Sequence, residues 1–318
     1  MRLLAIALLI IVGNVNAAPE VDKLDQDLYL LRGEFAPGRQ PDGNSVLLRG
    51  KSGWIVVDTG RHAEHAQHIL DFVKSSGEPI AAVVNSHWHL DHIGGNALLK
   101  RAYPDLRVHA SMAIAAALDG FLAHYRKDLQ TQIASADSAT AKAAWQAEIA
   151  IIDTGKALYP DVPVTESATL MMIGRELQMN LAQRAVTDGD VWLYDRDTRA
   201  LIAGDLVTLP VPFLDTACPA QWQRTLATLQ KVPFRLLVPG HGAPMTRKDL
   251  KHYRHGFDQL LDCAASDRSI AQCSDDWIET LDELIPAKEQ AFTRDLLEYY
   301  IGQVLRGDPK AITARCAG

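Results

Sequence analysis

Short apolar runs bounded by turn residues recur along both halves of the chain and predict β-strands. The predicted strands of the first half cover residues 28–34, 45–49, 54–57, 80–84 and 106–110. Those of the second half cover residues 168–173, 176–182, 190–195, 200–203 and 235–238. Helical spacing of apolar residues predicts helices over residues 62–74 and 96–102. Because strands and helices mix in two comparable halves, the pattern favours one α/β sandwich over two independent domains.

Two longer segments have helical patterns alone. Residues 111–160 are rich in alanine and predict a helical insert beside the cleft, which acts as a lid or a substrate wall. A second helical region begins at the predicted N-cap Thr246. Its amphipathic face is predicted at positions Phe292, Leu296, Tyr300 and Val304. We therefore expect a main domain over residues 20–245 that contains the insert, and a helical C-terminal extension over residues 246–318 packed on the same domain.

The N-terminus has the pattern of a cleavable signal peptide over residues 1–17. Arg2 precedes an unbroken apolar run, and small residues follow at the positions that a signal peptidase recognises. A membrane anchor is the alternative, but the apolar run is only about half as long as the ~20 residues that a spanning helix needs. We expect a periplasmic or secreted protein that begins at Ala18 or Pro19, with no stable membrane insertion after cleavage.

The four cysteines fit an exported protein. Cys263 and Cys273 lie close in sequence and bracket a polar stretch, which predicts a disulfide between them. Cys218 then pairs with Cys316 by elimination. Buried free thiols are the alternative, which an oxidising compartment disfavours.

Composition and charge narrow the range of partners. Hydrophobic residues make up 47% of the 318 residues and charged residues 22%, which is typical of a soluble globular protein. The formal net charge is −7, and Lys and Arg form no cluster along the chain. A protein that binds nucleic acid normally has a basic footprint, so we expect a small-molecule substrate and no nucleic acid. The sequence leaves the oligomeric state open.

The segment that carries most chemistry follows the predicted strand 80–84. It places three imidazoles and a carboxylate within six residues, at His87, His89, Asp91 and His92. Neutral imidazole nitrogen and carboxylate oxygen are the ligands that suit zinc and similar divalent ions. A lone histidine is more often structural, but four such groups at this spacing indicate a metal site.

This segment resembles the His-x-His-x-Asp-His motif of the metallo-β-lactamase superfamily. Three shorter matches follow predicted strands in the same order as in that family: Asp58 in Val-Asp-Thr-Gly, Asp205 in Ala-Gly-Asp, and His241 in Pro-Gly-His-Gly. The resemblance implies a four-layer αββα sandwich with the metal site at one edge of the sheets. It also implies one or two zinc ions, with His87, His89, Asp91, His92, Asp205 and His241 as ligands.

The resemblance implies a reaction as well. A metal-activated hydroxide attacks an ester, thioester, lactone or related small-molecule substrate. Asp91 holds the metal and orients the hydroxide, and Asp58 braces the ligands from behind. Trp88 and Phe213 are candidates to line the substrate cleft.

One position departs from the family pattern. Where the family has His-Thr-x-Gly-Asp, this chain has Val186-Thr-Asp-Gly-Asp, and it has no histidine between His124 and His241 that a shifted alignment could use. One metal position keeps Asp91, His92 and His241 and shares Asp205. The other keeps only His87 and His89 with Asp205. We therefore expect one tightly bound ion and a weakened second position.

Other functions stay open. Val186 by itself favours a zinc-binding pseudoenzyme, and some exported members of this superfamily are assigned as periplasmic accessory proteins of redox or quinoprotein systems. Among hydrolases, Asp205 is similar to the branches that cleave thioesters, lactones, or sulfate and phosphate esters. Zinc β-lactamases typically carry Cys or Ser at that position, so a β-lactamase-like amide hydrolase is a further alternative.

The remaining histidines of interest lie outside these motifs. Three follow Asp58 at three-residue steps, and we expect a solvated helix face for His65 and His68 and also for His124. His62 is the candidate to complete a metal site that lacks a ligand. His109 is expected to pack within a strand.

Overall fold

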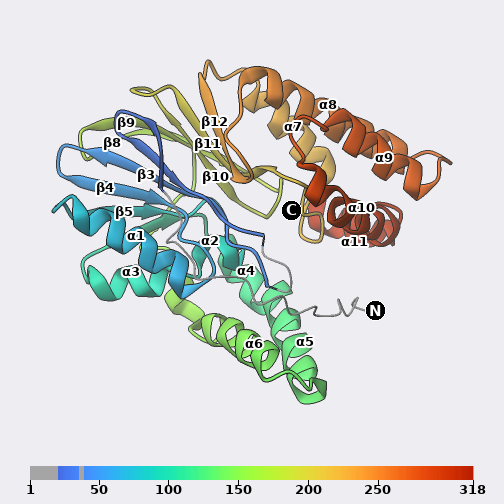
Figure 1. The fold of residues 1–318 in the computed structure, drawn as a ribbon, viewed down its shortest axis with the longest axis horizontal. Coiled ribbons are helices and arrows are strands. Elements are labelled where there is room, and N and C mark those ends of the chain that lie inside the picture. Colours follow the sequence, from blue (N-terminus) through green and yellow to red (C-terminus); the bar gives the residue numbers. More distant parts are fainter. Residues whose placement is uncertain (1–20, 36–38, 318) are drawn as a thin grey trace.

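The computed structural model describes residues 21–35 and 39–317, which form two sheets packed face to face with helices on both outer sides (Figure 1). The predicted signal peptide lies outside the described residues. The four-layer sandwich expected from the sequence is confirmed. No helix in the described ranges has the length and apolar character needed to cross a membrane.

The first sheet has seven strands in sequence order within the described residues. They are β1 (Val21–Asp25), β2 (Leu28–Leu31), β3 (Ser45–Gly50), β4 (Gly53–Val57), β5 (Ile80–Val84), β6 (Arg107–Ala110) and β7 (Val162–Pro163). The pairs from β1 to β4 are antiparallel, and those from β4 to β7 are parallel. Strand β4 is buried along its whole length, as expected for a strand covered on both faces.

The second sheet has the order β12-β11-β10-β9-β8. Its strands are β8 (Ala168–Met172), β9 (Arg175–Ala182), β10 (Asp190–Asp195), β11 (Ala200–Thr208) and β12 (Leu236–His241). Strands β8 to β11 pair antiparallel, whereas β11 and β12 are parallel. This parallel pair brings the Asp205 and His241 segments together at one end of the sheet.

The helices fall into three groups (Figure 1). The first sheet is covered by α1 (Ala63–Ser75) and α3 (Asn96–Ala102), and the short helix α2 (Leu90–Ile93) lies within the metal-ligand motif. The insert consists of α4 (Ala113–Asp119), α5 (Phe121–Ser135), α6 (Ala139–Ile152) and η1 (Gly155–Leu158). The third group consists of α7 (Pro219–Leu229), α8 (Arg247–Ala264), α9 (Ile270–Thr280), η2 (Ala287–Glu289), α10 (Gln290–Tyr299), η3 (Tyr300–Leu305) and α11 (Pro309–Cys316).

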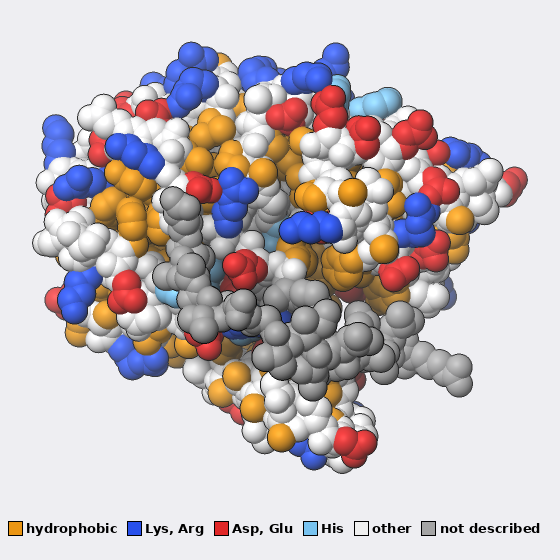
Figure 2. Space-filling model, viewed as in Figure 1, with side chains coloured by type: hydrophobic (Ala, Val, Ile, Leu, Met, Phe, Trp, Pro, Cys, Tyr) orange, Lys and Arg blue, Asp and Glu red, His pale blue; other side chains and the backbone are white. Residues whose placement is uncertain are grey.

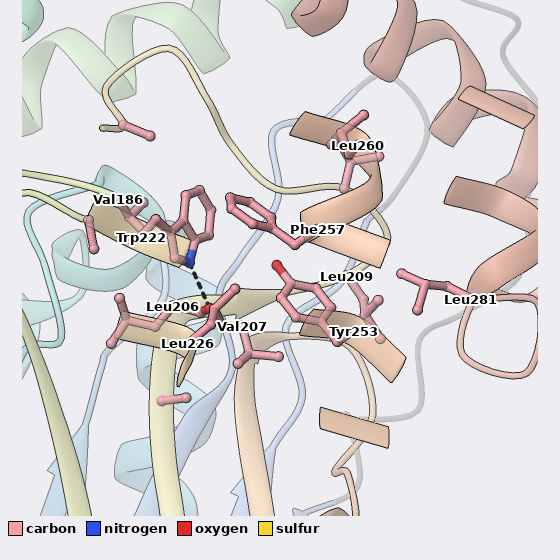
Figure 3. Packing of buried hydrophobic residues seen from close by; sticks show 14 of the residues in the cluster. Val186, Leu206, Val207, Leu209, Trp222, Leu226, Tyr253, Phe257, Leu260 and Leu281 are labelled. Carbon is pink, nitrogen blue, oxygen red and sulfur yellow. Dashed lines mark hydrogen bonds between the residues drawn. The ribbon is translucent and has the colours of Figure 1, made fainter. Parts of the chain in front are cut away.

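Three buried clusters correspond to the three interfaces between the four layers. One joins α1 and α3 to the first sheet, a second lies between the sheets, and a third joins the second sheet to α7, α8 and the helices that follow. Figure 3 shows part of the third cluster, where Trp222 of α7 packs beside Val186 and donates a hydrogen bond to the carbonyl of Leu206 at 2.9 Å. A smaller cluster beneath the insert includes Trp88 and Leu122.

Both predicted disulfides are present, Cys218–Cys316 and Cys263–Cys273. The helix predicted to begin after Thr246 does so, with a reciprocal capping box between Thr246 and Asp249. Basic and acidic side chains are interspersed on the face of the molecule that Figure 2 shows.

The predicted amphipathic face of the extension is wrong in part. Phe292 is 41% exposed, whereas Leu297 and Ile301 are completely buried. The apolar face is therefore offset from the predicted positions, although Tyr300 and Val304 belong to it as expected. The sequence pattern also missed strands β1 and β7 and helix α7.

We expect the C-terminal extension to fold in one cooperative unit with the sandwich, because its apolar face belongs to the third cluster. Leu297→Ala should lower the free energy of unfolding by about 2–5 kcal/mol, the usual loss for a fully buried leucine. Urea unfolding followed by tryptophan fluorescence and by far-ultraviolet circular dichroism measures this loss. Leu296→Ala, at a half-buried neighbour, is the matched control and should cost less. A separate early transition confined to helical signal would contradict the expectation.

Candidate metal centre

The side chains predicted to hold metal meet at one edge of the two sheets. Asp58 directly follows β4, and His87 lies three residues beyond β5. From the second sheet, Asp205 lies within β11 and His241 ends β12. The carboxyl ends of neighbouring parallel strands share one sheet edge, so residues far apart in sequence converge there. All seven predicted site residues are buried: Asp58, His87, His89, Asp91, His92, Asp205 and His241.

Four donor atoms form the better-furnished position. Asp91 Oδ2 lies 3.0 Å from His241 Nε2 and 3.6 Å from His92 Nε2. Asp205 Oδ1 lies 3.2 Å from His92 Nε2 and 3.7 Å from His241 Nε2. Atoms bound at ~2.0–2.1 Å to a tetrahedral zinc ion are about 3.3 Å apart, so each of these four spacings is compatible with a shared ion. The four atoms do not all lie within 4.8 Å of one another, because Asp205 is absent from the set of Asp91, His92 and His241. Glycine is required at position 240, because a Cβ there would lie 1.9 Å from Asp205 Oδ1.

Buried atoms without a hydrogen-bond partner and an excess of negative charge also indicate that this position can bind a cation. Among the described residues, the buried atoms His92 Nε2 and Asp205 Oδ1 have no hydrogen-bond partner. Burial opposes protonation of His92, yet the charges of Asp205, Asp58 and Asp91 raise the pKa of His92 well above its usual value. The carboxylates thus favour a positive charge here, and a divalent ion can supply it while using both free atoms.

The carboxylate of Asp58 fixes which nitrogen of His92 carries hydrogen. It accepts hydrogen bonds from the backbone amide and the hydroxyl of Ser86, both at 2.7 Å. His92 Nδ1 lies 2.8 Å from the same carboxylate, which can only accept, so this nitrogen donates. The Nε2 atom of neutral His92 therefore has a free lone pair directed at the four-donor position.

The same reasoning shows which nitrogen of His87 carries the hydrogen. The hydroxyl of Ser86 uses its one hydrogen on Asp58, so at 2.9 Å it must accept from His87 Nδ1. The free lone pair of neutral His87 is then on Nε2. This atom lies 3.7 Å from Asp205 Oδ2, the carboxylate oxygen that the four-donor position does not use.

A hydrogen bond to Thr216 determines which nitrogen of His89 carries the hydrogen. The hydroxyl of Thr216 donates to the carbonyl of Val186 at 2.8 Å, so at 3.0 Å it accepts from His89 Nε2. The free lone pair of neutral His89 is then on Nδ1. Thr216 belongs to the segment that joins β11 to α7, and nothing in its local sequence predicted this contact.

Two lone pairs therefore face each other in the second position. His87 Nε2 and His89 Nδ1 are 2.8 Å apart, and neither carries a hydrogen to share. Burial lowers the pKa of His89 to about 4 and that of His87 well below its usual value, so a shared proton is disfavoured near neutral pH. A metal ion is the natural partner of such a pair. With Asp205 Oδ2, this position has three protein donors, one fewer than its neighbour.

The structure groups the donors somewhat differently from the sequence expectation. The two sets of three donors that lie within 4.8 Å of one another in the described residues are His87, His92 and Asp205, and Asp91, His92 and His241. His89 is in neither set, because its Nδ1 atom is directed at His87 rather than at the carboxylates.

Val186 leaves the backbone of its loop intact. Asp190 accepts hydrogen bonds from the amides of Val186 and Thr187 and from the Thr187 hydroxyl, at 2.8–3.1 Å. The Val186 side chain is completely buried in the third cluster. The loop is therefore in place, and the difference from the family pattern is confined to one side chain that cannot bind metal.

A buried charge network, which no sequence pattern predicted, connects Asp91 to the insert. Arg61 lies 3.4 Å from Asp91 Oδ1 and 3.0 Å from Glu148 of α6, with all three side chains at most 10% exposed. Tyr125 of α5 donates to the same Glu148 oxygen at 2.5 Å. Arg61 thus engages the Asp91 oxygen that faces away from the four donors. Its partner Glu148 is 87 residues away in sequence, so no local pattern could indicate the network.

The other histidines have structural partners. His62 Nδ1 lies 2.8 Å from Asp42, and His62 belongs to neither metal-competent set. The expectation for His65 was wrong: it is 6% exposed and bonds to the Ser45 hydroxyl at 2.8 Å, and burial lowers its pKa to about 4. His124 is exposed as expected.

Two further expectations concern His68 and His109. His68 is half-buried rather than solvated. It lies in α1, which packs on the first sheet through Leu70 and neighbouring residues. His109 lies in β6 as expected.

Comparison with known proteins identifies the family to which the chain belongs. The chain matches the metallo-beta-lactamase superfamily over residues 38–241, and it belongs to that family. Among solved structures, a metallo-beta-lactamase from Pontibacter korlensis is similar with a TM-score of 0.57 at 20% identity, over 75% of this chain and 98% of that one. A sec-alkylsulfatase from Pseudomonas sp. is similar with a TM-score of 0.60 at 19% identity, over 91% of this chain and 51% of that one.

Curated relatives match over shorter shares of their own length. A linear primary-alkylsulfatase from Pseudomonas sp. is 24% identical over 80% of this chain and 52% of its own. An atrochrysone carboxyl ACP thioesterase from Passalora fulva is 37% identical over 29% of this chain and 28% of its own. The chain thus spans between about a quarter and about half the length of these relatives. Together with the family, they support a hydrolase.

The role of Asp58 can be tested with a shape-preserving change. Asp58→Asn removes an acceptor and places an amide donor against Ser86 and His92, so the two histidine tautomers are no longer fixed. We expect the zinc affinity to fall by about 10–100-fold, measured by competition with a chromophoric chelator. Asp42→Asn is the matched control, because Asp42 also accepts from two backbone amides and a histidine but binds no predicted ligand. Equal losses in both variants would contradict a specific role for Asp58.

Proposed function

We propose that the chain is an exported zinc-dependent hydrolase that acts on an ester, thioester, lactone or related small-molecule substrate. The observation that carries the proposal is the pair of buried donor sets that meet at His92, Asp91 with His241 on one side and His87 with Asp205 on the other. Two of their atoms, His92 Nε2 and Asp205 Oδ1, have no hydrogen-bond partner. The hydrolases among its relatives support the reaction type. The two disulfides and the N-terminal pattern support export.

The proposal gives each residue of the site a role. Asp91, His92, Asp205 and His241 hold the principal zinc ion, and His87 and His89 with Asp205 form the weaker position. A bound zinc ion lowers the pKa of water toward ~7 and polarises the bond to be cleaved. Asp91 offers one oxygen to the metal position while Arg61 keeps the other oriented, and Asp58 holds the ring of His92.

Two alternatives to this hydrolase are a zinc-binding pseudoenzyme and a β-lactamase-like amide hydrolase. A zinc-binding pseudoenzyme would be favoured by Val186, since it removes one nitrogen ligand. Against it, the hydrogen bonds of His87, His89 and His92 each leave one ring nitrogen free for a metal, and three protein ligands are enough for a catalytic zinc site. A β-lactamase-like amide hydrolase shares the fold, but this chain has Asp205 where zinc β-lactamases typically carry Cys or Ser.

The proposal predicts unequal metal positions and a metal-dependent activity. Purified protein should retain closer to one zinc ion than two by inductively coupled plasma mass spectrometry. His241→Ala should lose that ion and the hydrolysis of an ester, thioester and lactone panel, whereas His87→Ala should lose less zinc. Val186→His should raise the content toward two. Zinc-loaded protein that hydrolyses nothing in the panel would support the pseudoenzyme, and two ions of matched affinity in the unmodified protein would refute the inequality.

A further inference from the structure

Exposed aromatic rings are concentrated beside the metal ligands. Six large apolar or aromatic side chains are exposed in the described part of the chain, and three of these are phenylalanines: Phe35, Phe121 and Phe292. They come from the segment before β3, from α5 of the insert and from α10 of the extension. Their exposed fractions are 37–41%. Exposed apolar side chains that gather near a buried polar centre often mark a ligand-binding surface.

One group of rings lies beside His89. The ring of Phe213 is 4.9 Å from that of His89, centroid to centroid, and the ring of Trp88 is 4.6 Å from it. Phe121 contacts both, at 5.6 Å from Trp88 and 6.5 Å from Phe213. Trp88 and Phe213 therefore do lie beside the metal ligands, and the exposed Phe121 extends this aromatic surface outward along the insert.

A second group lies beside His241. The ring of Phe35 is 5.0 Å from the ring of His241, and Phe292 is 6.1 Å from Phe35. Phe292 was expected in the buried face of the extension, yet it is exposed next to Phe35. The two groups thus adjoin ligands of the two different metal positions, His89 and His241.

The charges near the centre are already paired. Arg61 is the basic side chain within ion-pair distance of a predicted metal ligand in the described residues, and it lies between Asp91 and Glu148. A buried arginine shared by two carboxylates has little capacity left to bind an anionic group of a substrate. Recognition beyond the metal is therefore left to the apolar rings.

We propose that Phe121 and Phe292, with the rings behind them, bind apolar groups on both sides of the bond that is cleaved. The substrate class is then an ester or thioester with an aromatic or alkyl group on each side. This inference rests on the proposed hydrolase function for the bond itself, whereas the binding of apolar groups can be measured without hydrolysis.

Two series of ligands test the proposal on the full mature protein. Hydrolysis is measured with p-nitrophenyl acetate, butyrate and hexanoate, and binding with acetophenone and hexanophenone, ketones that the enzyme cannot hydrolyse. Each fully buried methylene strengthens binding roughly fourfold, so partial burial of the longer chain should raise kcat/KM and ketone affinity by about tenfold or more. The acyl chain extends on one side of the carbonyl, so one of Phe121→Ala and Phe292→Ala should remove most of this gain. The other variant, at the ring facing the constant aryl group, should weaken the binding of acetophenone and hexanophenone alike.

Met171→Ala is the matched control, because Met171 is 69% exposed on the edge strand β8, away from the metal ligands. It should leave the chain-length dependence unchanged. If short and long esters are cleaved alike and hexanophenone binds no better than acetophenone, the substrate inference is overturned while the hydrolase stands. If no ester is cleaved but hexanophenone binding depends on both rings, the apolar site stands and the hydrolase fails. If Phe292→Ala abolishes self-association and leaves ketone binding intact, the rings are an interface instead.

Discussion

The carboxylate of Asp58 is the group on which the geometry of the site depends. It lies in the left-handed region of the backbone, with φ of 61°, which aspartate tolerates better than most residues. Because a carboxylate can only accept, the hydrogen-bond directions of Ser86, His87 and His92 follow from it. Each of these two imidazoles is left with its lone pair directed at the metal positions. A structure without this acceptor would leave both tautomers free.

The burial of so many carboxylates has a cost that a cation offsets. Asp58, Asp91 and Asp205 are all at most 7% exposed, and Arg61 is shared with Glu148. Burial disfavours the ionised forms, yet His92 and its neighbours hold the pKa of Asp91 and of Asp205 well below the usual value. The centre therefore remains rich in negative charge at neutral pH. A divalent ion bound here would balance that charge, so its binding would be linked to the stability of this edge of the sandwich.

The sequence predicted the parts of this arrangement whose signals are local. The strands β4, β5, β11 and β12 were predicted from apolar runs, and the ligands from residues that directly follow or end them. Partners that lie far away in sequence could not be predicted. His65 of α1 looked solvated because its bond to Ser45 of β3 leaves no periodic signal, and Thr216 reaches His89 across 127 residues. Phe292 fits a helical apolar pattern, but only the packed structure shows which face of α10 is buried.

The inequality of the two metal positions is tested most directly by locating zinc in crystals grown with the metal at less than one equivalent. Anomalous difference maps from data on either side of the zinc absorption edge give the occupancy of each position. We expect one strong peak among Asp91, His92, Asp205 and His241, with little density between His87 and His89. Equal peaks at both positions, or the stronger peak beside His87 and His89, would contradict it.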